Sequence, residues 1–486
     1  MSLLDTVRSV LGIKPVKVGD LDASVAPSRP TRQPARPQSR AESIADIEVV
    51  PEYSQVRQLL DAKVPLTFVT GGAGTGKSTL IRYLRNVLTS RIAVVAPTGV
   101  AALNAGGVTI HSLFHLPPKI IQSNDVKKVY DRQLYRKLEL LILDEVSMVR
   151  PDLLDGVDRF LRLNRDSNTP FGGVTVLLIG DLFQLPPVVP REEHQALRQM
   201  QYGTDFFFSS RGISDCSLVP VLLTRVFRQT DPSFIALLNG LREGKGVDQA
   251  LRAINARCVP LDPGEDHELV LTCTNRAADE RNGQELARLD TTSRTYSGSV
   301  TGDIRIEGTR LPAPVNLVLK VGAQVMFTKN DDDKRWVNGT IGRVVNLKER
   351  TVDVEIESSS IRQTIEVGPV TWEQYKYEYD EIKDRIIAKV VGQYTQLPLM
   401  LAWAVTIHKA QGKTLDRVFV DLGNRAFAAG QVYVALSRVR SLQHLRLARP
   451  IRAEEIRCDP KATQFYTQLV RMTQIEEDKQ PGGAYG

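Results

Sequence analysis

The 486-residue chain has few cysteines and no long hydrophobic run. Its four cysteines are Cys216, Cys258, Cys273 and Cys458, and no two of them lie close together in the sequence. This spacing fits neither a zinc site nor an iron–sulfur cluster, provides no disulfide framework, and favours a reducing compartment. No stretch approaches the roughly 18 apolar residues of a membrane-spanning helix, which argues against an integral membrane protein.

A strong excess of one charge is also missing. The chain has 63 Lys and Arg against 56 Asp and Glu, which gives a net charge of +7 and a pI near 9.1. Most of the basic residues are interspersed with acidic ones, so the composition permits a polyanionic partner without requiring one. A hydrophobic content of 42% and a charged content of 24% are typical of a soluble globular protein, and the length predicts about two to four domains.

Residues 23–41 contain no acid, but they carry four arginines and four prolines. Such a segment cannot bury a core, so we expect residues 1–48 to be a disordered basic and proline-rich tail. Apolar residues at its start fall on one helical face, and residues 1–20 could therefore form a helix that docks on a protein partner, or part of an organelle transit peptide. No cleavage-site pattern indicates a signal peptide. Residues 479–486 are predicted to be a second disordered tail.

Short apolar runs alternate with helical segments between Val49 and about Pro220. The runs are Leu66–Val69, Ile92–Ala96, Leu140–Leu143 and Val174–Ile179. Continuous apolar strands separated by helices predict an α/β domain over 49–220, with a parallel sheet covered on both faces. In such sheets the chemistry gathers at the carboxyl ends of the strands.

A second series of apolar runs predicts another α/β domain. These runs are Leu269–Leu271, Val405–Ile407, Val418–Val420 and Leu445–Leu447. Residues 312–397 interrupt the series, because apolar and acidic residues alternate there in the manner of antiparallel strands. We therefore assign 221–311 and 398–478 to the second domain and 312–397 to a small inserted β-barrel.

The stretch from Phe68 to Thr79 has the spacing of a phosphate-binding P-loop, between an apolar strand and an amphipathic helix. Glycines let backbone N–H groups converge on phosphate oxygens, and the helix N-terminus adds positive potential. We expect Lys77 to reach the β and γ phosphates and the Ser78 hydroxyl to bind Mg²⁺. The predicted ATP-binding residues of this loop are Gly71, Gly72, Ala73, Gly74, Thr75, Gly76, Lys77, Ser78 and Thr79.

Two carboxylates follow the apolar run Leu140–Leu143. After a P-loop, Asp144 is placed to hold Mg²⁺, and Glu145 to orient and deprotonate the attacking water; a helix-capping acid pair is the alternative. Another strand leads into the loop from Gly180 to Pro187, in which Gln184 could report the γ-phosphate. A plain proline-rich turn is the alternative for that loop.

Phosphoryl transfer also needs cations that arrive when the site closes. Arg228 lies just past the first domain, and Arg438 lies in a predicted helix of the second domain. If both reach the γ-phosphate, ATP clamps the two domains together and hydrolysis opens them. Surface salt bridges are the alternative role for each arginine.

Together these motifs resemble the superfamily-one helicases, and specifically the Pif family of the 5′-to-3′ branch. Further matching blocks are Ala96–Asn104, Thr109–Phe114, Thr274–Arg276, Leu319–Met326, Val337–Gly339 and Thr406–Thr414. The resemblance covers about Val49 to Gln468. The 3′-to-5′ branch usually carries Lys-Gly-Leu-Glu where this chain has Gln411-Gly-Lys-Thr414, which favours the 5′-to-3′ assignment.

The resemblance implies two RecA-like domains, an SH3-like barrel insertion, a small wedge insertion at about 115–137, and Mg-ATP hydrolysis without zinc or an iron–sulfur cluster. It also implies ATP contacts from Gln55, Gln411 and Gly412. The DNA contacts that it implies are Pro97, Thr98, Gly99, His111, Phe114, Asn338, Thr406, His408 and Lys409. His408 alone would more often be a structural histidine.

Two aromatic groups in the insertion have open roles. Lys329, Lys334, Arg335, Trp336 and Asn338 could form a basic, aromatic edge that steers DNA, or a solvated loop. Trp372, Tyr375, Tyr377 and Tyr379 lie among acids, which favours a structural or partner role over stacking on bases.

The expected function is a 5′-to-3′ DNA helicase that acts as a monomeric motor on single-stranded and forked DNA, in the replication, repair, recombination and telomere maintenance typical of the family. A RecD-like motor subunit of a nuclease complex is one alternative. An ATP-switched loader that grips a strand without unwinding is another. The expected location is the cytoplasm, in association with the nucleoid. In a eukaryote it could be an organelle or the nucleus.

Overall fold

The computed structural model describes residues 47–88, 91–259, 269–302, 311–331, 333–358, 361–426 and 428–479. All the described residues belong to one compact unit. The expectations for residues 1–46 and 480–486, including the docking helix, lie outside the described residues.

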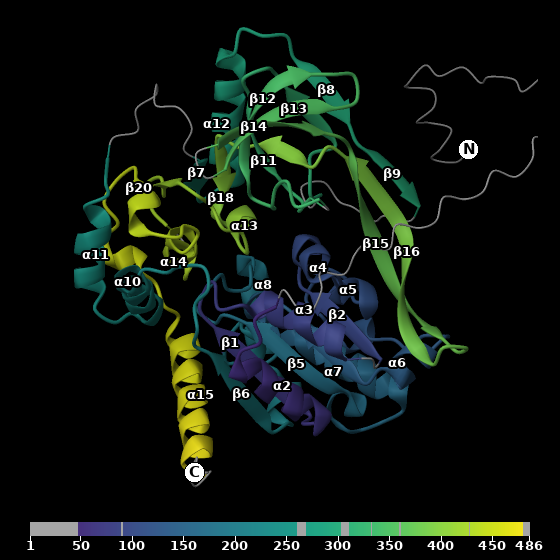
Figure 1. The fold of residues 1–486 in the computed structure, drawn as a ribbon. Helices are drawn as coiled ribbons and strands as arrows, with labels where there is room; N and C mark the ends of the chain where they lie inside the picture. Colours follow the sequence, from purple (N-terminus) through teal and green to yellow (C-terminus); the bar gives the residue numbers. More distant parts are fainter. Residues whose placement is uncertain are drawn as a thin grey trace, which may run out of the picture. The chain divides into compact units, whose positions relative to one another are not determined.

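A six-stranded parallel sheet lies at the centre of the first α/β domain (Figure 1). Its strands are β1 (Leu66–Gly71), β2 (Ile92–Ala96), β3 (Val108–Thr109), β4 (Leu140–Leu143), β5 (Thr175–Gly180) and β6 (Leu218–Leu223). Their spatial order is β3-β2-β4-β5-β1-β6, and every pairing is parallel. The helices are α2 (Pro51–Asp61), α3 (Lys77–Val87), α4 (Gly99–Ala105), α5 (Ile110–Leu113), α6 (Gln133–Lys137), α7 (Pro151–Arg165), α8 (Arg191–Gln199) and α9 (Arg211–Ser214). The four predicted strands and their parallel pairing are confirmed.

Both faces of this sheet are covered, which explains why its strands read as continuous apolar runs. Side chains alternate between the faces of a strand. Phe68 accordingly packs in the core cluster that includes α7, whereas Val69 packs in the cluster that includes α2 and α3. Every residue of β1 is buried. The carboxyl ends of β1, β4 and β5 are therefore held by rigid packing on two sides.

The second α/β domain contains a four-stranded parallel sheet. Its strands are β7 (Leu269–Thr272), β18 (Ala404–Thr406), β19 (Val418–Asp421) and β20 (Leu445–Leu447), in the order β18-β7-β19-β20. The associated helices are α10 (Pro232–Glu243), α11 (Val247–Asn255), α12 (Asn275–Arg288), α13 (Ile407–Ala410) and α14 (Gln431–Leu436). The second predicted series of parallel strands is also confirmed.

The inserted segment is antiparallel, as the alternating pattern predicted, but it is longer than 312–397. Its strands are β8 (Arg294–Ser297), β9 (Ser299–Gly302), β10 (Asn316–Leu319), β11 (Gln324–Phe327), β12 (Ile341–Leu347), β13 (Val352–Ser358), β14 (Ile361–Val367), β15 (Val370–Asp380), β16 (Arg385–Gln396) and β17 (Leu399–Leu401). Five of them form a sheet in the order β14-β13-β12-β11-β17. Because β8 pairs with β10, β9 with β16, and β17 with β11, the insertion spans residues 294–401.

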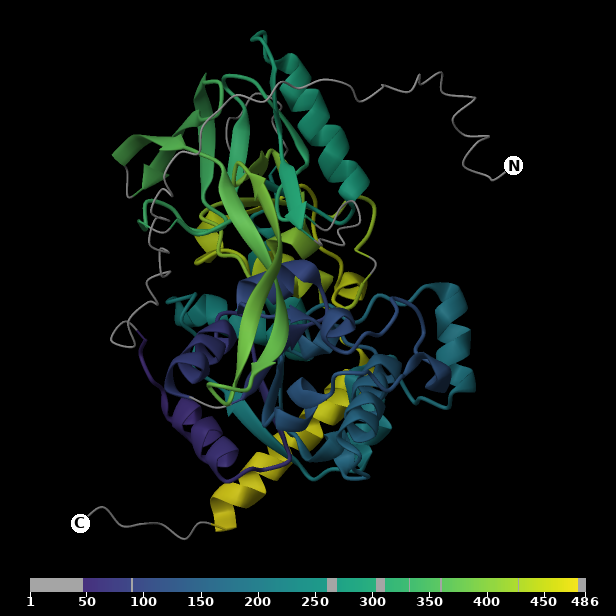
Figure 2. The ribbon, with the colours of Figure 1, turned by 90° about the vertical axis from the view of Figure 1, so that its right-hand side faces the viewer.

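Strands β15 and β16 form a long ribbon that reaches the first domain (Figures 1 and 2). Tyr377 is buried in the core of that domain, and its hydroxyl accepts a hydrogen bond from the backbone N–H of Val94 at 3.2 Å. Near the tip of the ribbon, Asp384 forms an ion pair with Arg91. Trp372 is buried and stacks on Tyr394. The prediction that these aromatic residues are structural is confirmed for Trp372 and Tyr377.

Helix α15 (Pro460–Lys479) follows the second sheet in the sequence but packs on the first. Ala462 and Leu469 belong to the same buried cluster as Phe68, and the ring of Phe465 stacks on Phe208 at 4.4 Å. The assignment of all of 398–478 to the second domain was therefore wrong for this helix. Its amphipathic pattern predicts a helix with one buried face, but not which domain provides the partner surface.

No helix in the described ranges is both long and apolar enough to cross a membrane. The four cysteines are all within these ranges, and each is a free thiol.

The packing of α15 leads to a stability prediction. Leu469→Ala should lower the free energy of unfolding by about 2–5 kcal/mol, because Leu469 is only 1% exposed and its loss leaves a cavity between α15 and the first sheet. Met472→Ala is the matched control on the same helix, since Met472 is 39% exposed and should change stability by less than about 0.5–1 kcal/mol. Urea unfolding measures both; equal effects would contradict the packing of α15.

Candidate nucleotide and nucleic-acid site

The P-loop connects the end of β1 to the start of α3, as predicted. Gly74 and Gly76 adopt positive φ angles of 81° and 89°, a region that residues with a Cβ rarely occupy. A Cβ on Gly74 would lie 2.5 Å from Cβ of Arg228, and one on Gly76 would lie 2.4 Å from the hydroxyl of Tyr53. The loop therefore needs glycine both for its backbone shape and for the side chains that pack against it.

Lys77 is held inside this loop. Its ammonium donates hydrogen bonds to the carbonyl oxygens of Gly71 and Gly72, both at 2.8 Å. Burial lowers the pKa of Lys77, and the nearby carboxylates of Asp181 and Glu145 oppose this shift. A cation held in place among backbone dipoles is suited to bind the terminal phosphates of a nucleotide.

Asp144 and Glu145 follow directly after β4, and both are largely buried. Burial, reinforced by the charge of Glu145, raises the pKa of Asp144 to about 7. Glu145 has a left-handed backbone conformation with φ of 50°, which costs a non-glycine residue about 1–2 kcal/mol. Backbone strain of this kind is concentrated at functional sites, where the surrounding structure imposes it.

The residues present fit a bound Mg²⁺ ion. Buried, like-charged carboxylates are stabilised by a cation, and a hydroxyl and a carboxylate are hard oxygen ligands of the type that Mg²⁺ prefers. Ser78 and Asp144 are the residues that would hold the ion. When bound, it would neutralise charge on the phosphates.

The second domain contributes Gln411 to this site. Its side-chain amide donates a hydrogen bond to Glu145 Oε2 at 3.3 Å and another to Gln184 Oε1 at 3.2 Å. The structure thus brings together three predicted site residues that are far apart in the sequence. Next to Gln411, the carbonyl oxygen of Gly412 accepts a hydrogen bond from Arg228 at 3.4 Å.

The two predicted arginines lie together beside the P-loop. Arg228 donates to the hydroxyl of Thr414 at 3.0 Å and to the carbonyl oxygen of Ser437 at 3.2 Å. Arg438 is 1% exposed and donates to the carbonyl oxygen of Val434 at 2.7 Å. Burial, with Arg228 as the next cause, lowers the pKa of Arg438 to about 9. Their partners are oxygens without a formal charge rather than surface carboxylates, which rules out the salt-bridge alternative in this conformation.

Arg438 lies just outside the helix in which it was predicted, because α14 ends at Leu436. Contact of either arginine with a γ-phosphate stays a prediction.

Several residues of the site were not predicted from the sequence. The hydroxyl of Tyr433 accepts a hydrogen bond from the backbone N–H of Ala73 in the P-loop at 2.7 Å. Asp181 is completely buried next to Gln184. The N–H of Phe227 donates to the carbonyl oxygen of Gly74 at 2.8 Å. Tyr433 and Asp181 lie inside motifs that the sequence analysis recognised. Each is a polar residue beside apolar neighbours, and this pattern could have marked it as a site residue.

Gln55 is exposed on α2, whose buried residues are Tyr53, Val56 and Leu60. The residue of α2 that contacts the P-loop is Tyr53, whose hydroxyl donates to the carbonyl oxygen of Gly76 at 2.7 Å. A contact between Gln55 and adenine stays a prediction.

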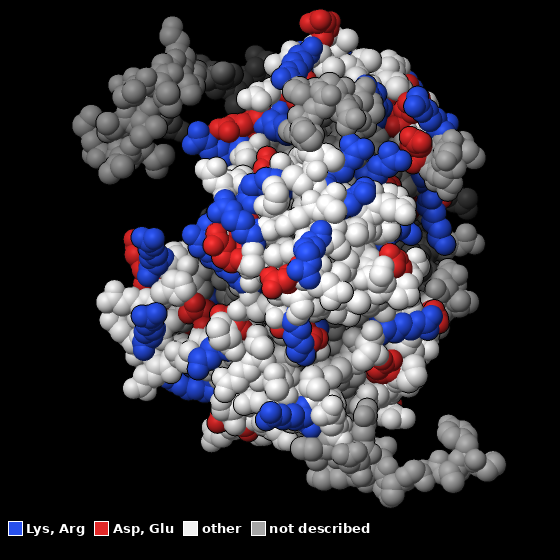
Figure 3. Space-filling model, turned by 90° about the vertical axis from the view of Figure 1, so that its left-hand side faces the viewer, with Lys and Arg blue, Asp and Glu red and all other residues white. Residues whose placement is uncertain are grey.

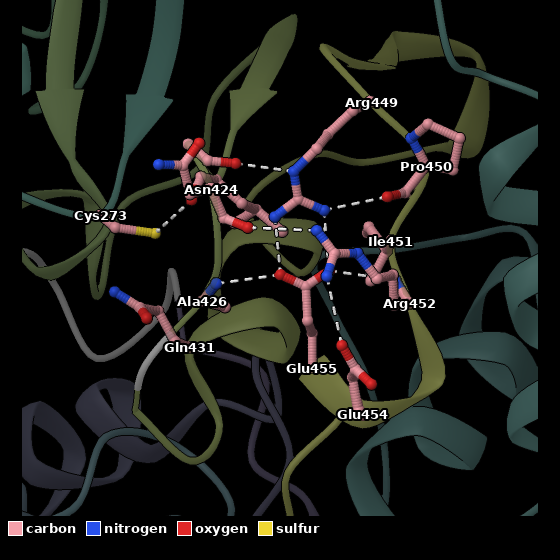
Figure 4. A network of polar contacts seen from close by, with 12 residues as sticks. Cys273, Asn424, Ala426, Gln431, Arg449, Pro450, Ile451, Arg452, Glu454 and Glu455 are labelled. Atoms are coloured by element: carbon pink, nitrogen blue, oxygen red, sulfur yellow. Dashed lines mark hydrogen bonds and ion pairs between the residues drawn. The ribbon is translucent and has the colours of Figure 1, made fainter.

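A charged network holds the loop that precedes α14 (Figure 4). The Glu455 carboxylate pairs with Arg449 at 2.6 Å and accepts a hydrogen bond from the N–H of Ala426 at 3.0 Å. The Arg449 guanidinium lowers the pKa of Glu455 to about 2. The loop ends at Gly430, where a Cβ would lie 2.3 Å from the carbonyl oxygen of Phe183. The start of α14 therefore lies in close contact with the Gln184 loop.

Four threonines at the carboxyl ends of strands cap the helices that follow. Thr98 caps α4, Thr109 caps α5, Thr274 caps α12 and Thr406 caps α13, and each hydroxyl accepts a backbone N–H of the first turn. Two caps belong to each α/β domain, and Thr109 and Thr274 were not predicted as site residues. Helix N-termini of this type bind phosphate groups, including those of a nucleic-acid backbone.

The predicted DNA contacts differ in accessibility. Lys409, Thr98 and Gly99 are at least partly exposed, and so are Pro97 and His111. Burial lowers the pKa of His408, which favours its neutral form. Thr406 is 4% exposed, so only its backbone and cap geometry are directly available.

Phe114 is a correction to the predicted DNA contacts. It is completely buried and packs edge-on against Phe160 at 5.5 Å. Its position at the end of α5 directs the ring into the core, so it cannot stack on a base in this conformation.

The predicted aromatic edge of the insertion is also partly wrong. Trp336 is buried and stacks on Phe327 at 4.5 Å. Lys329 donates to the carbonyl oxygen of Thr371, and Arg335 is paired with Asp331. Asn338 is half-buried and its N–H donates to Asn330, and its contact with DNA stays a prediction.

On the face shown in Figure 3, basic side chains are most frequent in the upper and middle parts, with acidic ones scattered between them. This distribution agrees with a modest net charge of +7. It provides positive potential without forming a continuous patch.

Comparison with known proteins agrees with these motifs. The model of the PIF1-like helicase family matches residues 53–249, and a model described as helicase matches 392–472. The ATP-dependent DNA helicase PIF1 of Emericella nidulans is 34% identical over 89% of this chain, which spans 65% of that protein's length. The ATP-dependent DNA helicase Pif1 of Bdellovibrio bacteriovorus is 33% identical over 88% of this chain and 93% of that protein.

Solved structures of a Pif1 from Bacteroides are also similar. The structure in complex with ADP-AlF4 has a TM-score of 0.81 at 34% identity and covers 88% of this chain and 98% of that one. The structure bound to ssDNA has a TM-score of 0.64 at 35% identity, with coverages of 87% and 97%.

The geometry around Glu145 predicts the effect of one substitution. Glu145→Gln keeps the size of the side chain but removes the carboxylate that is predicted to act as the base, so ATP hydrolysis should fall by about 100-fold or more while ATP binding is retained. Phosphate release and the affinity for a fluorescent ATP analogue measure the two effects. Glu139→Gln is the control, because Glu139 is 51% exposed at the other end of the same strand; equal rates in the two variants would exclude Glu145 as the base.

Proposed function

Because the chain belongs to the PIF1-like helicase family, we propose that it is an ATP-dependent DNA helicase. It would hydrolyse Mg-ATP between its two α/β domains, move along single-stranded DNA in the 5′-to-3′ direction and unwind duplex DNA ahead of it. DNA is proposed as the substrate because the relatives are named as DNA helicases. The geometry of the nucleotide site supports the mechanism.

The observation that carries this proposal is the joint construction of the nucleotide site. The first domain supplies the P-loop, Glu145 and Gln184, and the second supplies Gln411 and Arg438. Since a γ-phosphate would lie among groups from both domains, its presence or loss changes how strongly the domains attract each other. Hydrolysis can therefore drive opening and closing.

The four capping threonines support a track for one DNA strand. The helix starts that Thr98 and Thr109 cap would hold backbone phosphates on the first domain, and those that Thr274 and Thr406 cap would hold them on the second. Backbone contacts of this type do not depend on base sequence, which suits a motor that must pass every base. Closing and opening between two grips would then move the protein along the strand.

In this mechanism the chain's own residues perform distinct steps. Lys77 and the N–H groups of its loop would bind the terminal phosphates, and Arg228 and Arg438 would stabilise negative charge that develops during transfer. Gln184 and Gln411 would position the attacking water. Glu145 would accept the proton of this water, because its Oε2 is hydrogen-bonded to Gln411 and the carboxylate therefore lies beside the positioned water.

The polarity leads to a direct prediction. A forked or tailed duplex with a 5′ single-stranded tail should be unwound in the presence of ATP and Mg²⁺, and the same duplex with only a 3′ tail should not. Strand separation of fluorescently labelled duplexes measures this. Lys77→Ala should abolish unwinding and retain most DNA binding.

The other outcomes of this assay identify the alternatives. Unwinding from the 3′ tail alone would exclude the proposed direction. ATP hydrolysis stimulated by DNA without unwinding would favour the ATP-switched loader. Unwinding that appears only after a nuclease partner is added would favour the RecD-like subunit.

We also propose that residues 1–20 bind a protein partner, on the basis of their apolar helical pattern. Deletion of residues 1–40 should leave DNA-stimulated ATP hydrolysis unchanged and remove the proteins that co-purify with the full chain. A sequence-scrambled version of residues 1–20 is the control for composition. Unchanged co-purification by both variants would contradict the docking role.

A further inference from the structure

A buried ion pair links the Gln184 loop to the second domain. Asp181 is completely buried in the first domain, and the Arg242 side chain, from α10 of the second domain, is 5% exposed. An oxygen of Asp181 lies 3.2 Å from both Nη2 and Nε of Arg242. Buried ion pairs contribute little net stability, because the desolvation of both charges offsets their attraction. The burial of this pair is therefore better explained by a role in fixing the geometry of the groups around it.

The Arg242 guanidinium is enclosed by aromatic rings as well. It lies 4.7 Å from the ring centre of Phe183 and 4.9 Å from that of Tyr466 in α15. The two rings also meet edge-to-face at 5.1 Å. Arg242 thus contacts the Gln184 loop of the first domain and α15 at once, which leaves its guanidinium little rotational freedom.

Asp181 connects this fixed cation to the residues at the γ-phosphate position. Its Oδ2 accepts a hydrogen bond from the Gln184 amide at 3.0 Å. Since the Nε2 of Gln184 is used in this bond, its Oε1 faces Gln411, which also donates to Glu145. A chain of contacts therefore runs from Arg242 through Asp181, Gln184 and Gln411 to the proposed base.

A second branch from Asp181 reaches the P-loop. The Tyr433 hydroxyl donates to Asp181 Oδ2 at 3.5 Å and accepts the N–H of Ala73 at 2.7 Å. Asp181 also acts electrostatically on Lys77, where its charge opposes the effect of burial on the lysine pKa. A change in the position of this carboxylate would disturb both branches.

We propose that Arg242 is a positioning residue for ATP hydrolysis, which holds Asp181 so that the amides of Gln184 and Gln411 are correctly oriented at Glu145. The role rests on the proposed ATPase function and adds to it a cation that does not touch the nucleotide. Because Arg242 is on the second domain and stacks on α15, the orientation of Gln184 depends on how that domain and that helix are seated. Hydrolysis is then fast only when the two domains are fully docked.

The role predicts a split between turnover and binding. Without the guanidinium, the Asp181 carboxylate is no longer held in place, and Gln184 loses the fixed acceptor of its amide. Arg242→Met should lower kcat of DNA-stimulated ATP hydrolysis by about 10- to 100-fold, as expected for misplaced catalytic groups. KM for ATP and the affinity for ADP should change by less than about 3-fold, since neither branch removes a direct phosphate contact.

The matched control is a largely buried arginine–aspartate pair that lies wholly within the first domain. Arg150 donates to Asp152, whose side chain is also completely buried, with N···O distances of 2.9 and 3.0 Å. Arg150→Met should lower the thermal midpoint but leave kcat per folded molecule unchanged. Arg242→Lys should recover part of the activity, because it retains the charge without the planar fork.

Two further variants keep the test decisive. If Arg242→Met does not fold, Arg242→Lys and Tyr466→Leu provide the measurement: both should lower kcat by about 3-fold or more, because one removes the guanidinium fork and the other the ring that confines it. Equal kcat in wild type and in all folded variants would refute the positioning role. So would a rise in KM without a fall in kcat. Absence of hydrolysis in the wild-type chain would instead contradict the proposed function itself.

Discussion

The hydrogen bonds that Gln411 donates to Glu145 and Gln184 join the two α/β domains at the proposed base. Each sheet is packed mainly within its own buried clusters. The groups that could act on a γ-phosphate are nevertheless divided between them. Arg228, Gly430 and Tyr433 all lie where one domain closes on the other, and small glycines permit this close approach. The chemistry of the site therefore depends on a docking geometry rather than on either domain alone.

Most of the α/β fold could be predicted from the sequence because its strands are buried on both faces. Runs such as Leu140–Leu143 contain no polar residue that could face water, so the folded chain must bury both faces of the strand between helices. The limits of the insertion could not be predicted, since β8 and β9 pair with strands distant in the sequence. The partner surface of helix α15 could not be predicted either. Its apolar stripe is visible in the sequence, but the surface that the stripe covers depends on the folded chain.

The site shows a similar division. The P-loop is one continuous stretch of sequence, and so is the carboxylate pair after β4. Each could therefore be recognised from its local spacing alone. Asp181 and Tyr433 are each a polar residue among apolar neighbours, but their roles, like that of Arg242, depend on contacts across more than 60 residues of sequence that no local pattern shows. Phe114 shows the opposite error. It lies within a motif-like block, but the turn at the end of α5 directs its ring inward.

Helix α15 follows the second domain in the sequence but packs on the first, so the chain crosses between the two α/β domains again after the segment that leads from β6 to α10. The β15–β16 ribbon is a further attachment, because Tyr377 is buried in the core of the first domain. A body attached at several points loses most of its freedom to slide or twist. The ring stack of Phe465 on Phe208 lies at one of these attachments. Each ATP cycle would then repeat the same limited movement of one domain against the other, whatever the bases of the strand that passes through.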